Sequence, residues 1–152
     1  MHGAGVFHVK SVPYLAHMEQ TLFTKIINRE VPAEIVYETE HALAFLDIHP
    51  TNKGHTLVVP KVWSRNMLSI EKEPWSAVME TVRYLAPRIQ KALNADGINI
   101  IANCEPAAGQ IIFHTHVHII PRFEGDGFQQ WNGSDYAEGE MAQVAKLVRE
   151  TL

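Results

Sequence analysis

Short apolar or alternating stretches of the chain predict five β-strands. They span residues 34–38, 41–48, 55–60, 98–103 and 111–122. Alternation with a period of two indicates a strand, because successive side chains point to opposite faces. The connections are short and rich in Pro, Asn and Gly, as in the 49–54 segment. Such connections favour an antiparallel sheet.

Apolar residues at helical spacing predict three helices, over residues 21–28, 74–93 and 137–152. Thr21 is the expected N-cap of the first helix. The second is long and keeps its apolar residues on one side. The third is expected to close the domain. Helices and strands are partly segregated, so we predict an α+β fold: a five-stranded antiparallel sheet with one long helix, a short N-terminal helix and a C-terminal helix.

Composition narrows the class of protein. The chain of 152 residues fits one domain, and its net charge of -4 gives no general attraction to nucleic acid or to anionic membranes. The lone cysteine, Cys104, excludes an intramolecular disulfide and favours a cytoplasmic location. No apolar run approaches the ~20 residues of a membrane span. Residues 1–17 have no clear period, so we treat them as an N-terminal extension and place the domain at 18–152.

Three histidines alternate with other residues in the predicted fifth strand. His114, His116 and His118 would project from one face at steps of about 7 Å. Three interpretations are open. The rings could be hydrogen-bonded residues of a partly buried strand, they could bind zinc, or a neutral imidazole could attack phosphorus and form a covalent intermediate. In the last case, a neighbouring imidazole would protonate the leaving group.

The residues upstream of the histidines favour phosphoryl chemistry. Gly109 would let the backbone approach a ligand closely, and Asn103 and Gln110 offer neutral amide donors for phosphate oxygens. No Asp or Glu lies between Pro106 and Pro121. A metal site would gain from a carboxylate there, whereas an anionic phosphate would be repelled by one.

The stretch from His114 to Ile120 resembles the signature of the histidine-triad (HIT) superfamily, H-φ-H-φ-H-φ-φ with φ mostly apolar. The resemblance extends over roughly residues 20 to 128 and is closest to the Hint-like branch, so a HIT-like fold is implied. The segments that share it are Phe23 to Ile27, Val31 to Ala33, Ala44 to Ile48 with Pro50, Gly54 to Lys61, Asn103, Ala108 to Gln110, and Pro121 with Arg122.

The resemblance implies a role for each histidine. His116 would be the nucleophile that attacks the α-phosphorus of a nucleotide. His118 would contact the phosphate and help to protonate the leaving group. The backbone carbonyl of His114 would fix the tautomer of His116, and His55 would be a fourth histidine near the site.

The resemblance also implies a nucleotide pocket. Asp47 would bond the ribose hydroxyls, although it could instead cap the turn before Pro50. The remaining positions line the base pocket (Phe23, Ile26, Ile48, Leu57) or the phosphate side (Asn103, Gly109, Gln110, Ile111). For Phe23, Ile26 and Leu57, an ordinary core role is an equal alternative. Many nucleotide-binding members carry Ser or Thr at the position of Ile111, which can offer only its backbone N–H.

The implied function is hydrolysis of nucleoside 5′-phosphoramidates, of AMP-amide or AMP-lysine type, through a covalent nucleotidyl-histidine. The histidine at 118 favours hydrolysis over nucleotidyl transfer. The alternatives are a dinucleoside polyphosphate hydrolase, as in the fragile-histidine-triad branch, and a purine nucleotide-binding protein whose catalysis is incidental. A metal-dependent enzyme is a further option. We expect no metal, no cofactor, no nucleic acid or membrane partner, and a homodimer.

Overall fold

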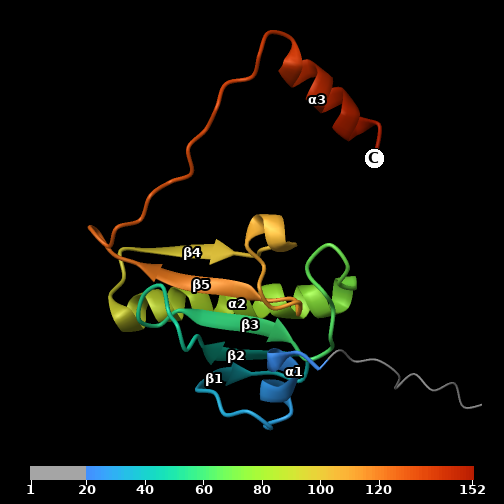
Figure 1. The fold of residues 1–152 in the computed structure, drawn as a ribbon. Coiled ribbons are helices and arrows are strands. Elements are labelled where there is room, and N and C mark those ends of the chain that lie inside the picture. The colour runs from blue at the N-terminus through green and yellow to red at the C-terminus, as the bar shows by residue number, and fades with distance from the viewer. Residues whose placement is uncertain (1–19) are drawn as a thin grey trace, which may run out of the picture.

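The computed structural model describes residues 20–152, and its centre is a five-stranded antiparallel sheet (Figure 1). The predicted extension at 1–17 and the domain start at 18 lie outside the described residues. The sheet order is β1-β2-β3-β5-β4. The strands are β1 (Ile35–Glu38), β2 (Ala42–Leu46), β3 (Thr56–Pro60), β4 (Gly97–Ile101) and β5 (Val117–Arg122). This confirms the predicted α+β class and the number of strands.

The fifth strand is shorter than predicted. It begins at Val117 rather than at residue 111, so only His118 of the three histidines lies in a strand. The preceding segment bonds to a loop instead, because Thr115 N–H donates to the Ser64 carbonyl at 2.8 Å and the two hydroxyls lie 2.7 Å apart. The prediction that all three histidines lie in the fifth strand was therefore wrong, although their rings stay adjacent: Phe23 contacts the rings of both His114 and His116, and the His116 and His118 centroids lie 4.9 Å apart.

Helix α2 (Lys72–Leu93) covers one face of the sheet (Figure 1). Its buried residues pack on alternate positions of the central strands, among them Ala44, Val58, Val117 and Ile119. The short 3₁₀ helix η1 (Pro106–Ala108) follows β4. Because Val117 and Ile119 face α2, the side chain between them, His118, is directed to the opposite face.

Helix α1 (Leu22–Ile27) lies on that opposite face, and Thr21 caps it as predicted. Phe23 and Ile26 pack on the intervening strand residues, which include Phe45 and Leu57. The site is therefore built on the face of the sheet that α1 covers only in part.

Helix α3 (Glu140–Arg149) exists as predicted but does not close the domain. None of its residues is buried, and its apolar side chains Met141, Leu147 and Val148 are exposed. Figure 1 shows it well away from the sheet. Within the described part of the chain, no helix combines the length and apolar character needed to cross a membrane.

Candidate active site

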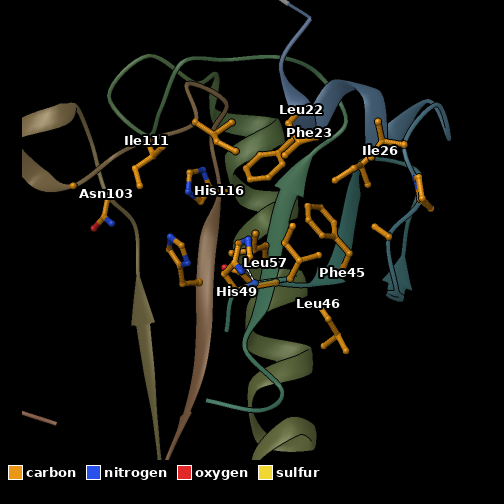
Figure 2. A pocket seen from close by; sticks show the side chains of 18 residues that line it. Leu22, Phe23, Ile26, Phe45, Leu46, His49, Leu57, Asn103, Ile111 and His116 are labelled. Atoms are coloured by element: carbon orange, nitrogen blue, oxygen red, sulfur yellow. Dashed lines mark hydrogen bonds between the residues drawn. The ribbon is translucent and has the colours of Figure 1, made fainter. Parts of the chain in front are cut away.

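A cavity of about 400 Å³ opens beside the histidines on the α1 face (Figure 2). This volume lies within the range of small-molecule sites. Aliphatic and aromatic side chains form most of its wall, and no Lys or Arg is among the described residues that line it. The polar and titratable lining residues are Asp47, His49, Asn103, His116 and His118, and Gly109 also lines the cavity.

His114 is fully buried and holds both of its ring nitrogens in hydrogen bonds. Nε2 lies 3.0 Å from the Pro60 carbonyl, which can only accept, so Nε2 carries the proton. Nδ1 is then a lone pair, and it accepts from the Thr21 hydroxyl at 3.1 Å. Burial lowers the pKa of His114, which keeps the ring neutral. The residue therefore anchors the segment rather than facing the cavity.

His116 is held in the tautomer that a nucleophile needs. Its Nδ1 lies 2.6 Å from the backbone carbonyl of His114, so Nδ1 must donate and Nε2 keeps a free lone pair. This is the carbonyl contact that the resemblance implied. Burial lowers the pKa of His116, so the ring is neutral near pH 7. The edge of the Phe23 ring, with centroids 5.1 Å apart, fixes the plane of the imidazole.

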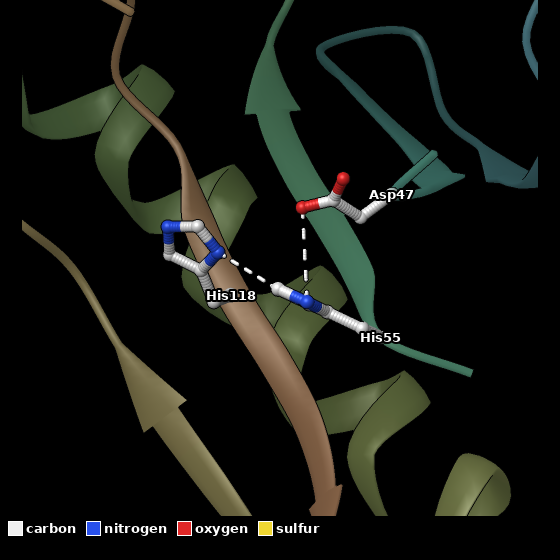
Figure 3. A group of neighbouring side chains, drawn as sticks. All are labelled: Asp47, His55 and His118. Atoms are coloured by element: carbon white, nitrogen blue, oxygen red, sulfur yellow. Dashed lines mark hydrogen bonds and ion pairs between the residues drawn. The ribbon is translucent and has the colours of Figure 1, made fainter. Parts of the chain in front are cut away.

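His118 and His55 are hydrogen-bonded to each other, and Asp47 lies beside His55 (Figure 3). His55 Nε2 lies 2.9 Å from His118 Nδ1, and Asp47 Oδ2 lies 3.7 Å from His55 Nδ1. Burial is the largest cause that lowers the pKa of both rings. For His118, burial together with the neighbouring His116 and His55 lowers the pKa to about 4.

The loop between Asp47 and His55 is hydrogen-bonded to the end of β5 and to the segment after it. Asn52 donates from Nδ2 to the Pro121 carbonyl and to Asp126, both at 2.8 Å. The hydrogen bond from Arg122 holds the pKa of the Asp126 carboxyl well below its usual range, so the carboxylate that accepts from Asn52 stays charged. The Thr51 N–H consequently points at His55 Nδ1, with an N···N distance of 3.2 Å.

Within residues 20–152, Asp47, His55 and His118 form a group that could hold a metal ion. One ligand atom from each lies within 4.8 Å of the others. A cation at this point would have to displace the 2.9 Å bond between the two imidazoles. The geometry therefore suits a hydrogen-bonded chain better than it suits a coordination site.

The cavity brings together most of the predicted nucleotide contacts. Phe23, Ile26 and Leu57 are buried and also line the wall, so core packing and ligand contact are both open to them. Asp47 caps its turn, since Oδ1 accepts from His49 N–H at 2.8 Å, yet it also lines the cavity. Ile48 and Ile111 are exposed at the rim, 77% and 87% respectively, which leaves them open to a ligand.

The Gln110 side chain was expected on the phosphate side of the pocket, but its amide is hydrogen-bonded within the protein. Its Oε1 accepts from Asn66 Nδ2 at 3.1 Å and from Glu105 N–H at 2.8 Å. Its Nε2 donates to the carbonyls of Arg65 and Ile112, at 2.7 and 3.1 Å. The side chain is buried and does not line the cavity. It holds the 105–112 segment in place instead of offering an amide to phosphate.

Several residues that shape the site carried no signal in the sequence. Thr21 was recognised as a helix cap, but its bond to His114 joins segments 93 residues apart. Thr51 acts through its backbone N–H, which every non-proline residue has. His49 lines the cavity but stands outside the alternating histidines.

Comparison with known proteins gives consistent matches. The HIT domain family matches residues 28–125. An uncharacterised HIT-like protein of Methanocaldococcus jannaschii is 48% identical over 108 residues, which is 70% of this chain and 81% of that protein. Adenylylsulfatase HINT3 of Arabidopsis thaliana is 39% identical over 105 residues, 69% of this chain and 53% of that protein. The crystal structure of a Streptococcus mutans protein superposes with a TM-score of 0.84 at 39% identity, covering 91% of this chain and 88% of the other.

Proposed function

The chain belongs to the HIT domain family, and on that premise we propose that it hydrolyses nucleoside 5′-phosphoramidates of AMP-amide or AMP-lysine type. The observation that carries the proposal is the 2.6 Å bond from His116 Nδ1 to the His114 carbonyl. It leaves the Nε2 lone pair of a neutral imidazole beside a cavity of nucleotide size.

The reaction proceeds in two displacements. His116 Nε2 attacks the α-phosphorus, the P–N bond breaks, and its electron pair goes to the leaving nitrogen. That nitrogen takes a proton from the imidazolium form of His118, which the negative charge of the bound phosphate favours, and departs as the amine, leaving His118 neutral. Water then attacks phosphorus, the bond to Nε2 breaks and returns its electron pair to His116, and the water proton goes to His118.

The cavity supports the binding of a nucleotide. The Asp47 carboxylate has acceptor positions beyond the one that His49 uses, and these suit two vicinal ribose hydroxyls. The wall formed by Phe23, Ile26 and Leu57 offers apolar surface to a purine base. The backbone at Gly109, with φ of +88°, leaves room beside Asn103 for phosphate oxygens.

The side chains that line the cavity suit a leaving group that departs as an amine better than one that departs as a phosphate chain. A dinucleoside polyphosphate would expel an anion, and no Lys or Arg among the described lining residues would meet it. The polyphosphate hydrolase is therefore the weaker alternative. A protein that binds nucleotide with incidental catalysis would show tight AMP binding and slow turnover.

The test is hydrolysis of adenosine 5′-phosphoramidate, with chelator present, by the wild type and by His116→Ala. We expect a loss of at least about 1,000-fold in the variant, because no other group supplies the nucleophile. AMP should still bind. His41→Ala, which removes an exposed histidine, is the matched control. A mass increase equal to one nucleotidyl group on the wild type would identify the intermediate, and equal turnover by wild type and His116→Ala would refute the mechanism.

A substrate panel separates the alternatives. Diadenosine triphosphate tests the polyphosphate reaction, and adenosine 5′-phosphosulfate is included because one relative is named an adenylylsulfatase. A higher kcat/KM on the phosphoramidate than on either compound supports the proposal. A higher value on diadenosine triphosphate would replace it.

We propose, in addition, that the protein is a cytoplasmic homodimer. The exposed apolar side of α3 supplies surface that a second copy could cover, and Cys104 is a free thiol. Sedimentation at micromolar concentration tests the dimer, and cell fractionation tests the location. A monomeric mass would contradict the first statement.

A further inference from the structure

The loop between β3 and α2 is hydrogen-bonded to the backbone that leads into β5. The Trp63 indole N–H donates to the Phe113 carbonyl at 3.0 Å, and the Thr115 N–H donates to the Ser64 carbonyl at 2.8 Å. These two bonds lie on either side of His114. The segment that carries the first two histidines is therefore held by a loop instead of by a neighbouring strand.

Thr115 is a polar residue at a position where the histidine-triad signature is mostly apolar. It is buried nevertheless, and so is Ser64, with 2% and 8% of their surfaces exposed. The two hydroxyl oxygens lie 2.7 Å apart, and the Thr115 hydroxyl also donates to the Ser64 carbonyl at 3.2 Å. The Ser64 hydroxyl is then the donor between the two oxygens. Each side chain satisfies the other, as buried hydroxyls require.

Pairing with β3 does not extend to Thr115, and the reason lies in Pro60. Continued past its last pair, the register of β3 and β5 would set Thr115 opposite Pro60. Pro60 has no N–H to donate, and its carbonyl already accepts from His114 Nε2 at 3.0 Å. The strand ladder therefore ends before Thr115, and Ser64 provides a backbone partner in its place.

A single peptide group connects Ser64 to the proposed nucleophile. The Thr115 N–H and the His114 carbonyl belong to the same planar trans peptide group, in which they point in opposite directions. Ser64 accepts from the N–H at 2.8 Å on one side, and His116 Nδ1 donates to the carbonyl at 2.6 Å on the other. Because the group is rigid, the bond to Ser64 sets the direction in which the carbonyl points. The hydroxyl pair restrains the same residue, so the peptide group cannot rotate freely.

We propose that Ser64 and Thr115 are positioning residues for His116. Acting through the peptide group that follows His114, they hold its carbonyl on His116 Nδ1 and so direct the proposed nucleophile into the cavity. Neither side chain lines the cavity, so neither touches the substrate. The proposal rests on the proposed function and adds to it a loop residue, Ser64, that lies outside the segments carrying the resemblance.

Thr115→Val tests the role of the hydroxyl pair. Valine keeps the size and the branched Cβ, but it leaves the Ser64 hydroxyl without this buried partner. We expect kcat on adenosine 5′-phosphoramidate to fall about 10-fold, because small displacements of a reacting group are costly. The affinity for AMP should not change, since the walls of the cavity are intact. Thr115→Ser, which keeps the hydroxyl, should restore kcat to within about twofold of the wild type.

Ser64→Ala tests whether the two residues act as one unit. It removes the other half of the same bond and should lower kcat as much as Thr115→Val does. The double variant should lose no more than either single variant, because only one interaction is present to be lost. Losses that multiply in the double variant would show two separate effects and overturn the pair.

Thr81→Val is the matched control for stability. Thr81 is also buried, and its hydroxyl donates to the Ala77 carbonyl at 2.9 Å within α2, on the other side of the sheet from the cavity. This variant should be less stable to urea but unchanged in kcat at a temperature where it is folded. Equal losses of kcat in Thr81→Val and Thr115→Val would reduce Thr115 to a structural role. A Thr115→Val variant that loses stability but keeps its kcat would do the same.

Nuclear magnetic resonance tests the positioning without turnover. In the free wild type at neutral pH, the ring ¹⁵N shifts of His116 should place its proton on Nδ1 alone. Thr115→Val should show a mixture of the two tautomers, and Thr115→Ser should resemble the wild type. A pure Nδ1 tautomer in Thr115→Val would overturn the proposal. Failure of the proposed function would appear differently, as a wild type that is inactive on the amide while the tautomers still respond to Thr115→Val.

Discussion

The hydroxyl of Thr21 lies 3.1 Å from Nδ1 of His114, across 93 residues of sequence. The same oxygen accepts the Thr24 N–H at 3.2 Å and so caps α1. One side chain therefore joins the first helix, which forms a wall of the cavity, to the segment that carries the proposed nucleophile, His116.

Replacing Thr21 should affect both stability and catalysis. In Thr21→Val the cap and the bond to His114 are lost, and the free energy of unfolding should fall by about 1–2 kcal/mol. The His114 carbonyl becomes less firmly placed, so kcat should fall several-fold while AMP affinity stays nearly unchanged. Urea unfolding and steady-state kinetics measure the two effects. Thr21→Ser, which keeps the hydroxyl, should resemble the wild type, and a similar loss in that variant would contradict the explanation.

The buried histidines predict how stability depends on pH. Burial lowers the pKa of His55, His114, His116 and His118 from 6.5 in the folded protein, that of His118 to about 4. As the pH falls, the unfolded chain binds protons before the folded chain does. Stability should therefore be full above pH 6.5 and decline between about pH 6.5 and 4. Melting temperatures across this range test the decline, and His118→Gln should flatten it. A constant melting temperature would mean that the rings titrate normally.

Replacing Gly109 is predicted to lower both stability and activity, because the backbone at this residue has a positive φ. Its φ is +88°, and an added Cβ would lie 3.7 Å from Asn103 Nδ2, an ordinary contact. Gly109→Ala should cost about 1–3 kcal/mol of backbone strain and displace the phosphate side of the cavity. We expect kcat/KM to fall about 10-fold. Gly125→Ala is the control, because its φ is +78° and an added Cβ meets nothing within 4 Å. Equal losses of activity in the two variants would show that strain alone is responsible.

Gln110 is predicted to matter for stability more than for phosphate contact. Gln110→Ala would leave Asn66 Nδ2 and the Arg65 carbonyl without this partner in a buried setting, which should lower the free energy of unfolding by about 2–3 kcal/mol. AMP affinity measured under stabilising conditions should change little. Gln143→Ala, on the exposed helix α3, is the control. A large loss of AMP affinity without a loss of stability would restore the predicted phosphate contact.

The sequence was sufficient for the features that depend on local patterns. The α1 cap at Thr21, the five strands and the long helix all follow from periodicity and capping chemistry. The alternation of the histidines singled out a segment from which His116 and His118 line the cavity. It misjudged the backbone there, because the bonds from Thr115 to Ser64 compete with strand pairing and depend on a loop 51 residues away in sequence.

Long-range bonds account for the remaining differences. Gln110 looked like a phosphate ligand because its amide stands next to Gly109, yet four partners within the protein occupy it. The apolar side of α3 was read as a packing face, but amphipathic spacing does not specify what a helix packs against. The contacts of His55 with Asp47 and His118 depend on distances that only the folded chain supplies.

The alternation along β5 means that the register of this strand decides which side chains face the cavity. Val117 and Ile119 lie under α2 while His118 faces the cavity, so packing of the hydrophobic core determines which face His118 occupies. Deleting one residue within this strand would move each side chain beyond the deletion to the other face of the sheet. An imidazole would then be buried beneath α2, and an aliphatic side chain would face the cavity. Length variation among relatives should therefore be absent from this strand and should accumulate in the segment between Phe123 and α3.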